Sequence, residues 1–315
     1  MNDRPVVVQT EHLSPAAAAW LDERAIRIER PPDDPGLEEV LVEAAGLVVR
    51  TYTIVDDALL DAAPRLRVVG RAGVGLDNID VAACRARGIE VVSTPDANAQ
   101  AVVEYVLRLV TEVLRPVMTL DEAVDGETWR SYRAAVVGRR ELAGCTLGIL
   151  GLGRVGSRLA RVATALGMRV LYHDLLDIAP AARHGAEPAS PAALMQQSDV
   201  ISLHVDGRAS NRHLVDASLL DRMKPDAVFV NTSRGFVVDA AALADALRSR
   251  PDATALIDVH EDEPFRASYP LLGLPNARLY PHLASRTNAA MERMSWVVRD
   301  VMAVLEGRTP DHPAP

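Results

Sequence analysis

The chain has 315 residues, more than one ordinary domain needs and enough for two. Hydrophobic residues make up 49% of it and aromatic residues only 4%, which is typical of a large aliphatic α/β core. The formal net charge of −9 argues against nucleic acid or an anionic membrane as a partner, so an anionic ligand has to be held by local arginines.

The two cysteines and the lengths of the apolar runs further limit the class of protein. Cys84 and Cys145 stand alone, without a CxxC or Cys/His cluster, and predict neither a disulfide framework nor a metal site. No stretch approaches about eighteen uninterrupted apolar residues, and the N-terminal apolar run is too short for a signal peptide. We therefore expect a cytoplasmic protein with no membrane partner.

The first hundred residues alternate short apolar runs with helical patterns. The predicted strands are 6–8, 25–28, 47–49, 66–69 and 89–92, and the predicted helices are 15–21, 37–45, 56–62 and 79–87. Such alternation predicts a parallel sheet wound by helices. A longer helix is predicted over 97–114, followed by a loop that contains Trp129 and Tyr132.

The stretch from Cys145 to Asp174 combines a strand, a glycine-rich turn, a helix and a second strand. Gly151, Gly153 and Gly156 stand at GxGxxG spacing between the first strand and the helix. The first glycine allows a sharp turn, the second lets the backbone approach a pyrophosphate, and the third lets the helix pack closely on the strand. Because the N-terminal end of a helix is positive and carries free N–H groups, this turn favours a diphosphate.

Asp174, at the end of the second strand, selects the cofactor. Its carboxylate is placed to accept hydrogen bonds from ribose hydroxyls and would repel a 2′-phosphate. No arginine follows until Arg183. The sequence therefore predicts NAD rather than NADP.

Later strands are predicted at 200–203, 227–230, 254–257 and 277–280, and the last three are each followed by a polar segment. These segments are Asn-Thr-Ser-Arg-Gly at 231–235, Asp-Val-His-Glu-Asp-Glu-Pro at 258–264 and Pro-His-Leu at 281–283. In a doubly wound sheet, ligands bind outside the carboxyl ends of the strands. We therefore expect the three segments to meet at the nicotinamide end of the cofactor.

These segments supply an arginine, an acid and a histidine. Hydride transfer to a 2-keto acid needs a cation that grips the carboxylate, for which Arg234 is suited, and a proton donor, for which His282 is suited. A carboxylate such as Glu263 would orient the imidazole and favour its protonated form. Taken singly, these residues could instead be a surface ion-pair partner, a histidine satisfied beside a proline turn and a member of a solvated acidic loop.

The chain resembles the D-isomer-specific 2-hydroxyacid dehydrogenases along nearly its whole length, and is most similar to the short phosphoglycerate-dehydrogenase-like members. The segments that carry the resemblance are RAGVGLDNID (71–80), STPDANAQAVVEY (93–105), TLGILGLGRVG (146–156), NTSRG (231–235), DVHEDEP (258–264) and YPHLAS (280–285). The implied fold is α/β with two doubly wound parallel-sheet domains. A Rossmann NAD-binding domain at 99–286 is inserted into a discontinuous flavodoxin-like substrate domain at 1–98 plus 287–315.

The resemblance also implies roles for individual residues. Arg234, Glu263 and His282 form the catalytic triad, with Glu263 chosen over Glu261 because the family's acid directly precedes the proline. The implied cofactor-binding set is Gly151, Gly153, Arg154, Val155, Gly156, Asp174, His204, Val205, Thr232, Ser233, Arg234, Asp258 and His282. The implied substrate-binding set is Arg50, Arg71, Gly73, Val74, Asn98 and Arg234, and no metal is expected.

Within the substrate set, the backbone of Gly73 and Val74 is expected to meet the substrate carboxylate. Arg50 and Arg71 match positions that face the substrate's phosphate in the phosphoglycerate members, and the alternative for both is packing or a surface salt bridge. The sequence departs from the family at two places. The turn at 205–211 replaces the usual Pro-Leu-Thr, which puts cofactor affinity in doubt, and His260 replaces the usual aromatic residue.

The predicted function is reversible, NAD-dependent hydride transfer between the nicotinamide and C2 of a 2-hydroxy or 2-keto acid, with 3-phosphoglycerate or another doubly anionic acid as a possible substrate. One alternative is a hydroxypyruvate or glyoxylate reductase, and another is an NAD(H)-sensing binding protein similar to the family's co-repressor relatives. The expected partner is the small-molecule acid, with no nucleic acid. The resemblance implies a homodimer formed through the cofactor domain.

Overall fold

The computed structural model describes residues 4–315 and divides the chain into two compact units. Unit 1 contains residues up to Asn98 together with Ser285–Pro315, and unit 2 contains Ala99–Ala284. The sequence predicted that the chain returns to the substrate domain after residue 286, whereas in the structure it returns to unit 1 after Ala284. Within the described part of the chain, no helix is long and apolar enough to cross a membrane.

Unit 1 is a five-stranded parallel sheet in the order β2-β1-β3-β4-β5. Its strands are β1 (Val6–Gln9), β2 (Ile26–Glu29), β3 (Gly46–Val49), β4 (Val68–Arg71) and β5 (Glu90–Val92). Its helices are α1 (Pro15–Asp22), α2 (Leu37–Leu41), α3 (Asp57–Ala62), α4 (Val81–Ala86), α11 (Asn288–Ser295) and α12 (Val298–Leu305). This is the flavodoxin-like order, whose direction of winding reverses between β1 and β3.

Helices cover both faces of this sheet. Val7, Val48 and Val68 pack against α1 and α12 in one buried cluster, and residues of the opposite face pack against α2, α3 and α4 in another. Helix α12 lies close to β4. A Cβ built on Gly70 would be only 2.4 Å from a methyl group of Val301. The glycine therefore permits the last helix of the chain to pack on the sheet formed by the first hundred residues.

Unit 2 is a seven-stranded parallel sheet in the order β12-β11-β10-β9-β6-β7-β8. Its strands are β6 (Thr146–Leu150), β7 (Arg169–His173), β8 (Glu187–Pro188), β9 (Val200–Leu203), β10 (Val228–Asn231), β11 (Thr254–Ile257) and β12 (Ala277–Leu279). Its helices are α5 (Ala99–Leu114), α6 (Gly126–Ala135), α7 (Arg154–Ala165), α8 (Pro191–Gln197), α9 (Ala217–Leu220) and α10 (Ala240–Ser249), with short 3-10 turns at Pro180–Ala182, Ala209–Asn211 and Gly235–Val237.

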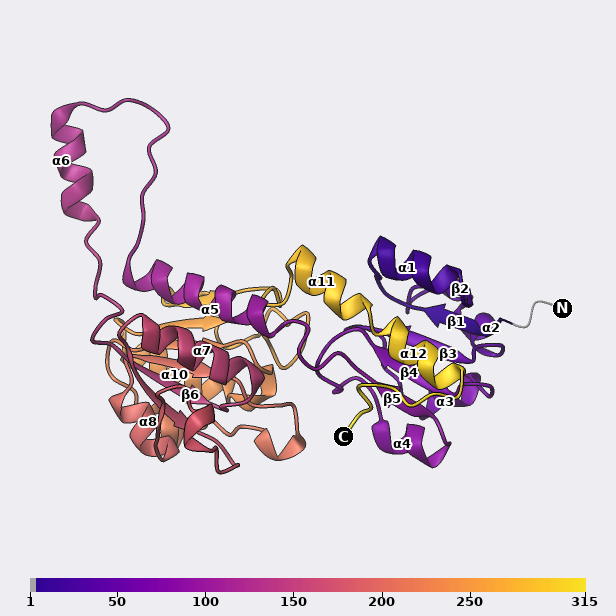
Figure 1. The fold of residues 1–315 in the computed structure, drawn as a ribbon. Helices are drawn as coiled ribbons and strands as arrows, with labels where there is room; N and C mark the ends of the chain where they lie inside the picture. Colours follow the sequence, from indigo (N-terminus) through magenta and orange to yellow (C-terminus); the bar gives the residue numbers. More distant parts are fainter. Residues whose placement is uncertain (1–3) are drawn as a thin grey trace. The chain divides into compact units, whose positions relative to one another are not determined.

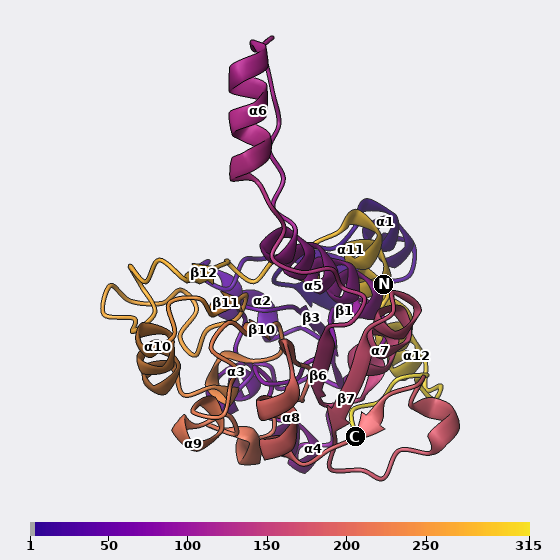
Figure 2. The same cartoon turned by 90° about the vertical axis from the view of Figure 1, so that its left-hand side faces the viewer.

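This order is that of the Rossmann fold extended by one strand, and the winding reverses between β6 and β9. Helices α5 and α7 cover one face, where they bury Val103 and Leu159 with Ile149, and α8, α9 and α10 cover the other (Figure 2). Parallel strands buried on both faces are expected to be almost continuously apolar, as β6 and β9 are. The carboxyl ends of β6 and β9 therefore define the position where a Rossmann sheet binds its ligand.

The segment between α5 and β6 was predicted as a loop, and this prediction is wrong. Residues 115–138 form an arm that contains α6, and Figure 1 draws α6 away from the sheet of its own unit. The Asp125 carboxylate caps the helix by accepting from the Thr128 N–H at 2.7 Å, and Glu127 and Arg133 complement the helix dipole. These local signals account for a helix that buries none of its residues.

The sequence has one continuous helical pattern over residues 288–306, whereas the structure divides this segment into two helices. Helix α11 ends at Ser295 and α12 begins at Val298. The Ser295 hydroxyl donates to the Met291 carbonyl at 2.8 Å and accepts from the Ser14 N–H at 2.9 Å. A serine that bonds back to the preceding turn bends a helix, and here it also attaches the bend to the start of α1.

Candidate active site

The glycine-rich turn after β6 has the geometry of a phosphate cradle. Gly151 has a φ of +94°, and a Cβ there would lie 2.7 Å from the His204 carbonyl oxygen, so only glycine lets the ends of β6 and β9 approach. A Cβ on Gly156 would lie 2.1 Å from the Gly151 carbonyl oxygen, whereas one on Gly153 would meet open space. No side chain caps α7 at Gly153, which leaves the first N–H groups of the helix for a ligand.

Asp174 fixes this turn through its carboxylate. One oxygen accepts from the Leu152 N–H at 2.7 Å and the other from the Leu176 N–H at 2.9 Å. Each ionised oxygen has a further lone pair for an outside donor such as a ribose hydroxyl. The residue predicted to recognise the ribose thus also holds the backbone of the cradle.

The unusual turn after β9 is organised by Asp206. Its carboxylate binds the Arg208 guanidinium and accepts from the Asn211 side chain at 3.1 Å. The hydrogen bond from Arg208 lowers the pKa of Asp206 below its usual value. An internal ion pair thus takes the place of the family's Pro-Leu-Thr in shaping this turn.

His204 begins the same turn, followed by Val205, which is half-buried. The His204 Nε2 lies 2.8 Å from the Ser202 hydroxyl. Burial lowers the pKa of His204 to about 4, so the ring is neutral at physiological pH. The structure therefore places an uncharged histidine at the switch point of the sheet.

The segment after β10 carries Arg234 in a tightly bonded turn. The Asn231 amide oxygen accepts from the Ser233 N–H and hydroxyl, and the Asn231 amide group donates to the Arg234 carbonyl at 2.9 Å. The Arg234 guanidinium donates to the Ser233 carbonyl at 2.7 Å. A Cβ on Gly235 would lie 1.9 Å from the carbonyl carbon of His260, so this glycine allows the ends of β10 and β11 to meet.

Two observations test whether these residues fit a dinucleotide. The open space at Gly153, beside the uncapped end of α7, fits a pyrophosphate. The Thr232 hydroxyl is a buried polar atom without a hydrogen-bond partner among the described residues, as expected where a ligand supplies the partner. Both features fit NAD, with Arg154 and Val155 at the start of α7 beside the cradle.

Glu263 and His282 form a hydrogen-bonded pair. The His282 Nδ1 lies 2.7 Å from Glu263 Oε2, and the two side chains are 36% and 28% exposed, so the pair can be reached by a ligand. Glu261, the rejected alternative, instead binds Arg212. Because the carboxylate accepts, Nδ1 carries a hydrogen, and the His282 Nε2 is the ring atom left to face a substrate.

The electrostatics keep Glu263 ionised. Burial alone would raise the pKa of this carboxyl, but the hydrogen bond and charge of His282, together with the His260 N–H at 2.9 Å, bring it below its usual value. The carboxylate is therefore charged across the neutral range and can accept the hydrogen bond from His282 Nδ1.

Asp258 holds the loop that carries His282. It is completely buried, and its carboxylate oxygens accept from the N–H groups of Leu283 at 2.8 Å and Ala284 at 2.9 Å. The Asp258 carbonyl also accepts from the His282 N–H at 2.9 Å. Sequence reasoning assigned Asp258 to the cofactor and missed this anchoring, which depends on a pairing between segments more than twenty residues apart.

Unit 1 contains a buried cation at the carboxyl end of β3. Arg50 is 9% exposed, and its guanidinium donates to the His12 carbonyl at 3.4 Å and contacts the Met291 Sδ at 3.0 Å. Burial lowers the pKa of Arg50 below its usual value; Glu11 opposes this shift, while the nearby positive charge of Arg286 adds to it.

Glu11, at the end of β1, shapes the loop that follows Arg50. Its carboxylate accepts from the N–H groups of residues 50–53 and from the Thr53 hydroxyl, at distances of 2.8 to 3.1 Å. The sequence analysis missed Glu11, although a carboxylate three residues after the predicted strand 6–8 was the available signal. Four consecutive backbone donors facing one carboxylate make the position of this loop specific.

The remaining predicted substrate residues lie in the same unit. A Cβ on Gly73 would lie 1.3 Å from Arg71 Nη1, so the guanidinium lies over the backbone where Gly73 has no side chain. The Gly73 carbonyl accepts from the Thr94 N–H and hydroxyl. Val74 and Asn98 are half-buried, the latter directly before α5.

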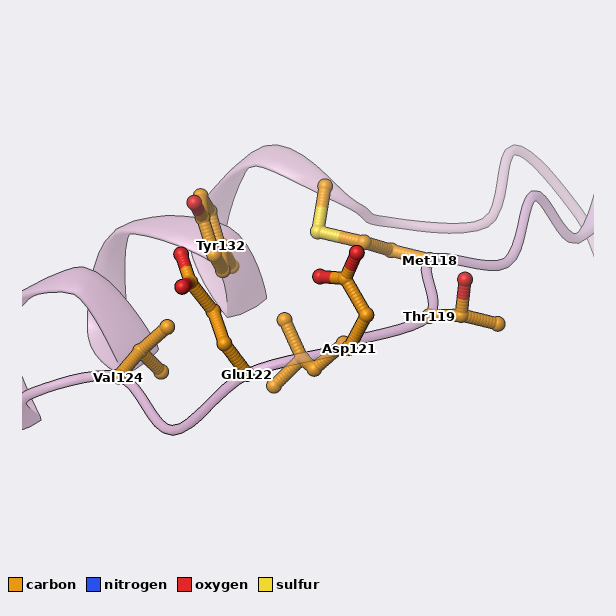
Figure 3. Close-up of a pocket in the computed structure, with 7 residues that line it drawn as sticks. Met118, Thr119, Asp121, Glu122, Val124 and Tyr132 are labelled. Carbon is orange, nitrogen blue, oxygen red and sulfur yellow. The ribbon is translucent and has the colours of Figure 1, made fainter.

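A hollow within the arm contains none of the predicted site residues. It is lined by Met118, Thr119, Leu120, Asp121, Glu122, Val124 and Tyr132, and Figure 3 shows the carboxylates of Asp121 and Glu122 in it. Two carboxylates would repel an anionic acid. Across residues 4–315, no group of three or more histidine, cysteine, aspartate or glutamate side chains could hold a metal ion.

Comparison with known proteins agrees with this arrangement. Residues 107–284 match the family model described as D-isomer specific 2-hydroxyacid dehydrogenase, NAD binding domain. The chain is 37% identical to a glyoxylate reductase of Aeropyrum pernix over 317 aligned positions, which cover 98% of this chain and 95% of that protein. It is 41% identical to an (S)-sulfolactate dehydrogenase of Chromohalobacter salexigens over 256 residues, covering 81% and 82% of the two chains.

Solved structures show the same fold. A D-lactate dehydrogenase of Aquifex aeolicus, in complex with NAD and lactic acid, matches this chain with a TM-score of 0.82 at 27% identity. The match covers 96% of each chain.

The two glycines beside α7 give a matched pair of substitutions. Gly153→Ala adds a methyl group where the fold has space but a pyrophosphate would approach, so we expect the melting temperature to change by less than about 2 °C and the Kd for NADH to rise at least about tenfold. Gly156→Ala drives a methyl group into backbone and should cost about 1 to 3 kcal/mol of unfolding free energy. Thermal unfolding and NADH fluorescence titration measure both effects. Unchanged NADH affinity in Gly153→Ala would place the pyrophosphate elsewhere.

Proposed function

The chain belongs to the D-isomer specific 2-hydroxyacid dehydrogenases, and from that premise we propose its substrate, the roles of its residues and its assembly. It is an oxidoreductase that acts on the CH–OH group of a small 2-hydroxy acid and uses NAD. NAD, held at the glycine-rich turn from Gly151 to Gly156, would supply the hydride acceptor for C2 of the hydroxy acid and, in its reduced form, the hydride donor for the keto acid.

The observation that carries the mechanism is the 2.7 Å contact between His282 Nδ1 and Glu263 Oε2. In reduction, Glu263 stabilises the imidazolium form of His282, and His282 Nε2 then donates its proton to the oxygen at C2. In oxidation, the neutral ring takes the hydroxyl proton from the same oxygen. Glu263 remains ionised in both directions, since the His282 ring and the His260 N–H keep its pKa low.

Arg234 supplies the positive charge in this proposal. Its guanidinium stays protonated at physiological pH and can grip a carboxylate through two hydrogen bonds. The turn from Asn231 to Gly235 holds the backbone on both sides of it, so the cation is positioned before substrate binds. The same charge polarises the C2 carbonyl toward the hydride.

The distal group of the substrate is proposed to be a second anion. Arg50 is a buried guanidinium whose hydrogen-bond partners are a carbonyl and a thioether, and Arg286 adds positive charge nearby. An anionic ligand would compensate a buried cation of this kind. The relative that acts on sulfolactate, an acid with a carboxylate and a sulfonate, supports this choice, while the glyoxylate reductase keeps a singly charged acid as the second candidate.

A homodimer formed through the arm of unit 2 is the proposed assembly. The arm exposes Val117, Met118, Leu120, Trp129 and Val137, with Val117 84% exposed, and α6 buries no residue within the chain. Apolar side chains gathered on one projecting segment mark an interaction surface. A second copy of the chain offers the same segment, as a two-fold interface requires.

Substitution of the His282–Glu263 pair tests the chemistry. His282→Ala should lower kcat by about 10²- to 10⁴-fold. Glu263→Gln removes the negative charge that stabilises the imidazolium, so the alkaline decline of the reduction rate should move to lower pH. Glu261→Gln is the control and should leave the pH profile unchanged. Stopped-flow NADH oxidation across pH gives these values, and undiminished turnover by His282→Ala would refute the assigned proton donor.

A substrate panel tests Arg50. NADH oxidation is compared for 3-phosphohydroxypyruvate, 3-sulfopyruvate and glyoxylate, in wild type and in Arg50→Met, which keeps most of the buried volume. We expect the substitution to lower kcat/KM about 10- to 100-fold for the doubly anionic acids and to leave glyoxylate little changed. Arg65→Met, at an exposed arginine paired with Glu43, serves as control. An equal loss for all three acids would assign Arg50 to structure instead.

The assembly is tested by analytical ultracentrifugation. The wild type should sediment as a dimer, and a Val117→Glu/Trp129→Glu double variant should sediment as a folded monomer, because charges on the arm oppose its burial. Val42→Glu, at an exposed apolar residue of unit 1, should remain dimeric. A monomeric wild type, or a double variant that stays dimeric, contradicts the proposed interface.

A further inference from the structure

We propose that His260 is a positioning residue for the His282–Glu263 pair. Its ring hydrogen-bonds the backbone of the segment that carries His282, and its own backbone N–H hydrogen-bonds the Glu263 carboxylate. The inference rests on the proposed function and goes beyond it, since the family resemblance expects only an aromatic packing residue at this position. His260 acts on the reaction through its contacts with the Glu263 carboxylate and with the backbone before His282.

The His260 ring is buried and hydrogen-bonded at both nitrogens. It is 6% exposed; Nε2 lies 2.9 Å from the Tyr280 carbonyl oxygen and Nδ1 lies 3.2 Å from the Tyr269 hydroxyl. A carbonyl oxygen can only accept, so Nε2 carries the hydrogen, and in the neutral ring Nδ1 accepts from Tyr269. A phenylalanine could fill this space but would leave the Tyr280 carbonyl without that donor.

The hydrogen bond to Tyr280 acts on the backbone of the proton donor. Tyr280 stands two residues before His282, whose φ of +54° places a non-glycine residue in the left-handed region. Such a conformation persists only when its surroundings hold it. Asp258 binds the loop on the C-terminal side of His282, and His260 binds it on the N-terminal side.

The backbone of His260 acts on the acid. Its N–H donates to Glu263 Oε1 at 2.9 Å, which leaves Oε2 for His282. The ring also packs edge-on against Phe265 and Tyr269, which are stacked on each other with centroids 5.0 Å apart. This aromatic group fixes the segment after Glu263, so one residue contacts the backbone leading to His282 and the carboxylate that orients it.

Tyr269 is suited to its part in this arrangement. Burial, together with the charges of Glu261 and Glu263, raises the pKa of its hydroxyl to about 12. The hydroxyl therefore keeps its proton over the working range and remains a donor to His260 Nδ1.

Four variants separate hydrogen bonding from packing. His260→Phe keeps the ring and loses both ring hydrogen bonds, while His260→Gln places an amide donor near the position of Nε2. His260→Asn provides no donor at that position, and Tyr269→Phe removes only the partner of Nδ1. We expect kcat to fall about tenfold in His260→Phe and His260→Asn, with KM and the Kd for NADH nearly unchanged, to fall less in Tyr269→Phe, and to recover in His260→Gln. Thermal unfolding confirms that each variant is folded.

A second comparison shows whether the effect passes through His282. In a His282→Ala background, His260→Phe should cause no further loss of kcat, because the group that it positions is absent. An equal loss in that background, or wild-type kcat in both His260→Phe and His260→Asn, would overturn the proposal.

Proton NMR provides a readout that is independent of turnover. The downfield signal of the His282 Nδ1–H, identified by its absence from His282→Ala, should be present in wild type and His260→Gln and lost in His260→Phe. An unaltered signal in His260→Phe would overturn the positioning role. If wild type turned over no 2-keto acid, the proposed function would fail, while this signal would still decide whether His260 positions the pair.

Discussion

The burial of the Asp258 carboxylate is the constraint on which the position of the His282–Glu263 pair depends. A fully buried charge is costly unless it is hydrogen-bonded, and the donors that satisfy Asp258 are the backbone N–H groups of Leu283 and Ala284. The loop after β12 must therefore close over the end of β11. That closure brings His282 within 2.7 Å of Glu263, which itself follows β11. The Asp258 carboxylate therefore links the folding of this loop to the position of His282.

Specific hydrogen bonds also hold the arginines that are proposed to bind substrate, although the chain as a whole is acidic. With a net charge of −9, the protein has no general attraction for anions, and within its own unit each of Arg50 and Arg234 is held by specific hydrogen bonds. Arg50 lies beside a loop whose four backbone N–H groups are bound by Glu11, and Arg234 lies in a turn held by Asn231. The carboxylates of Glu11, Asp258 and Glu263 accept hydrogen bonds from backbone N–H groups, and Glu263 also bonds His282.

Much of this was predictable because its signals are local. The GxGxxG spacing with its flanking apolar runs predicted the cradle, and alternating strands and helices predicted parallel sheets, whose strand orders the structure confirms as flavodoxin-like and Rossmann-like. What the sequence did not reveal depends on contacts between distant segments, such as the Asp258 bonds to residues 283 and 284 and the break before α12 at Ser295. Helix α6 is different, since its capping residue Asp125 was visible in the sequence and was overlooked.

The stereochemistry of the reaction tests the central claim most directly, because the proposed roles of Arg234 and the His282–Glu263 pair would fix which face of C2 receives the hydride. The measurement is the initial rate of NAD reduction with the separate D and L enantiomers of 3-phosphoglycerate and of lactate. The account predicts that any acid that is oxidised is oxidised as its D isomer, at a rate that His282→Ala lowers by about 10²- to 10⁴-fold. Equal rates for the two enantiomers, or a preference for the L isomer, would contradict it.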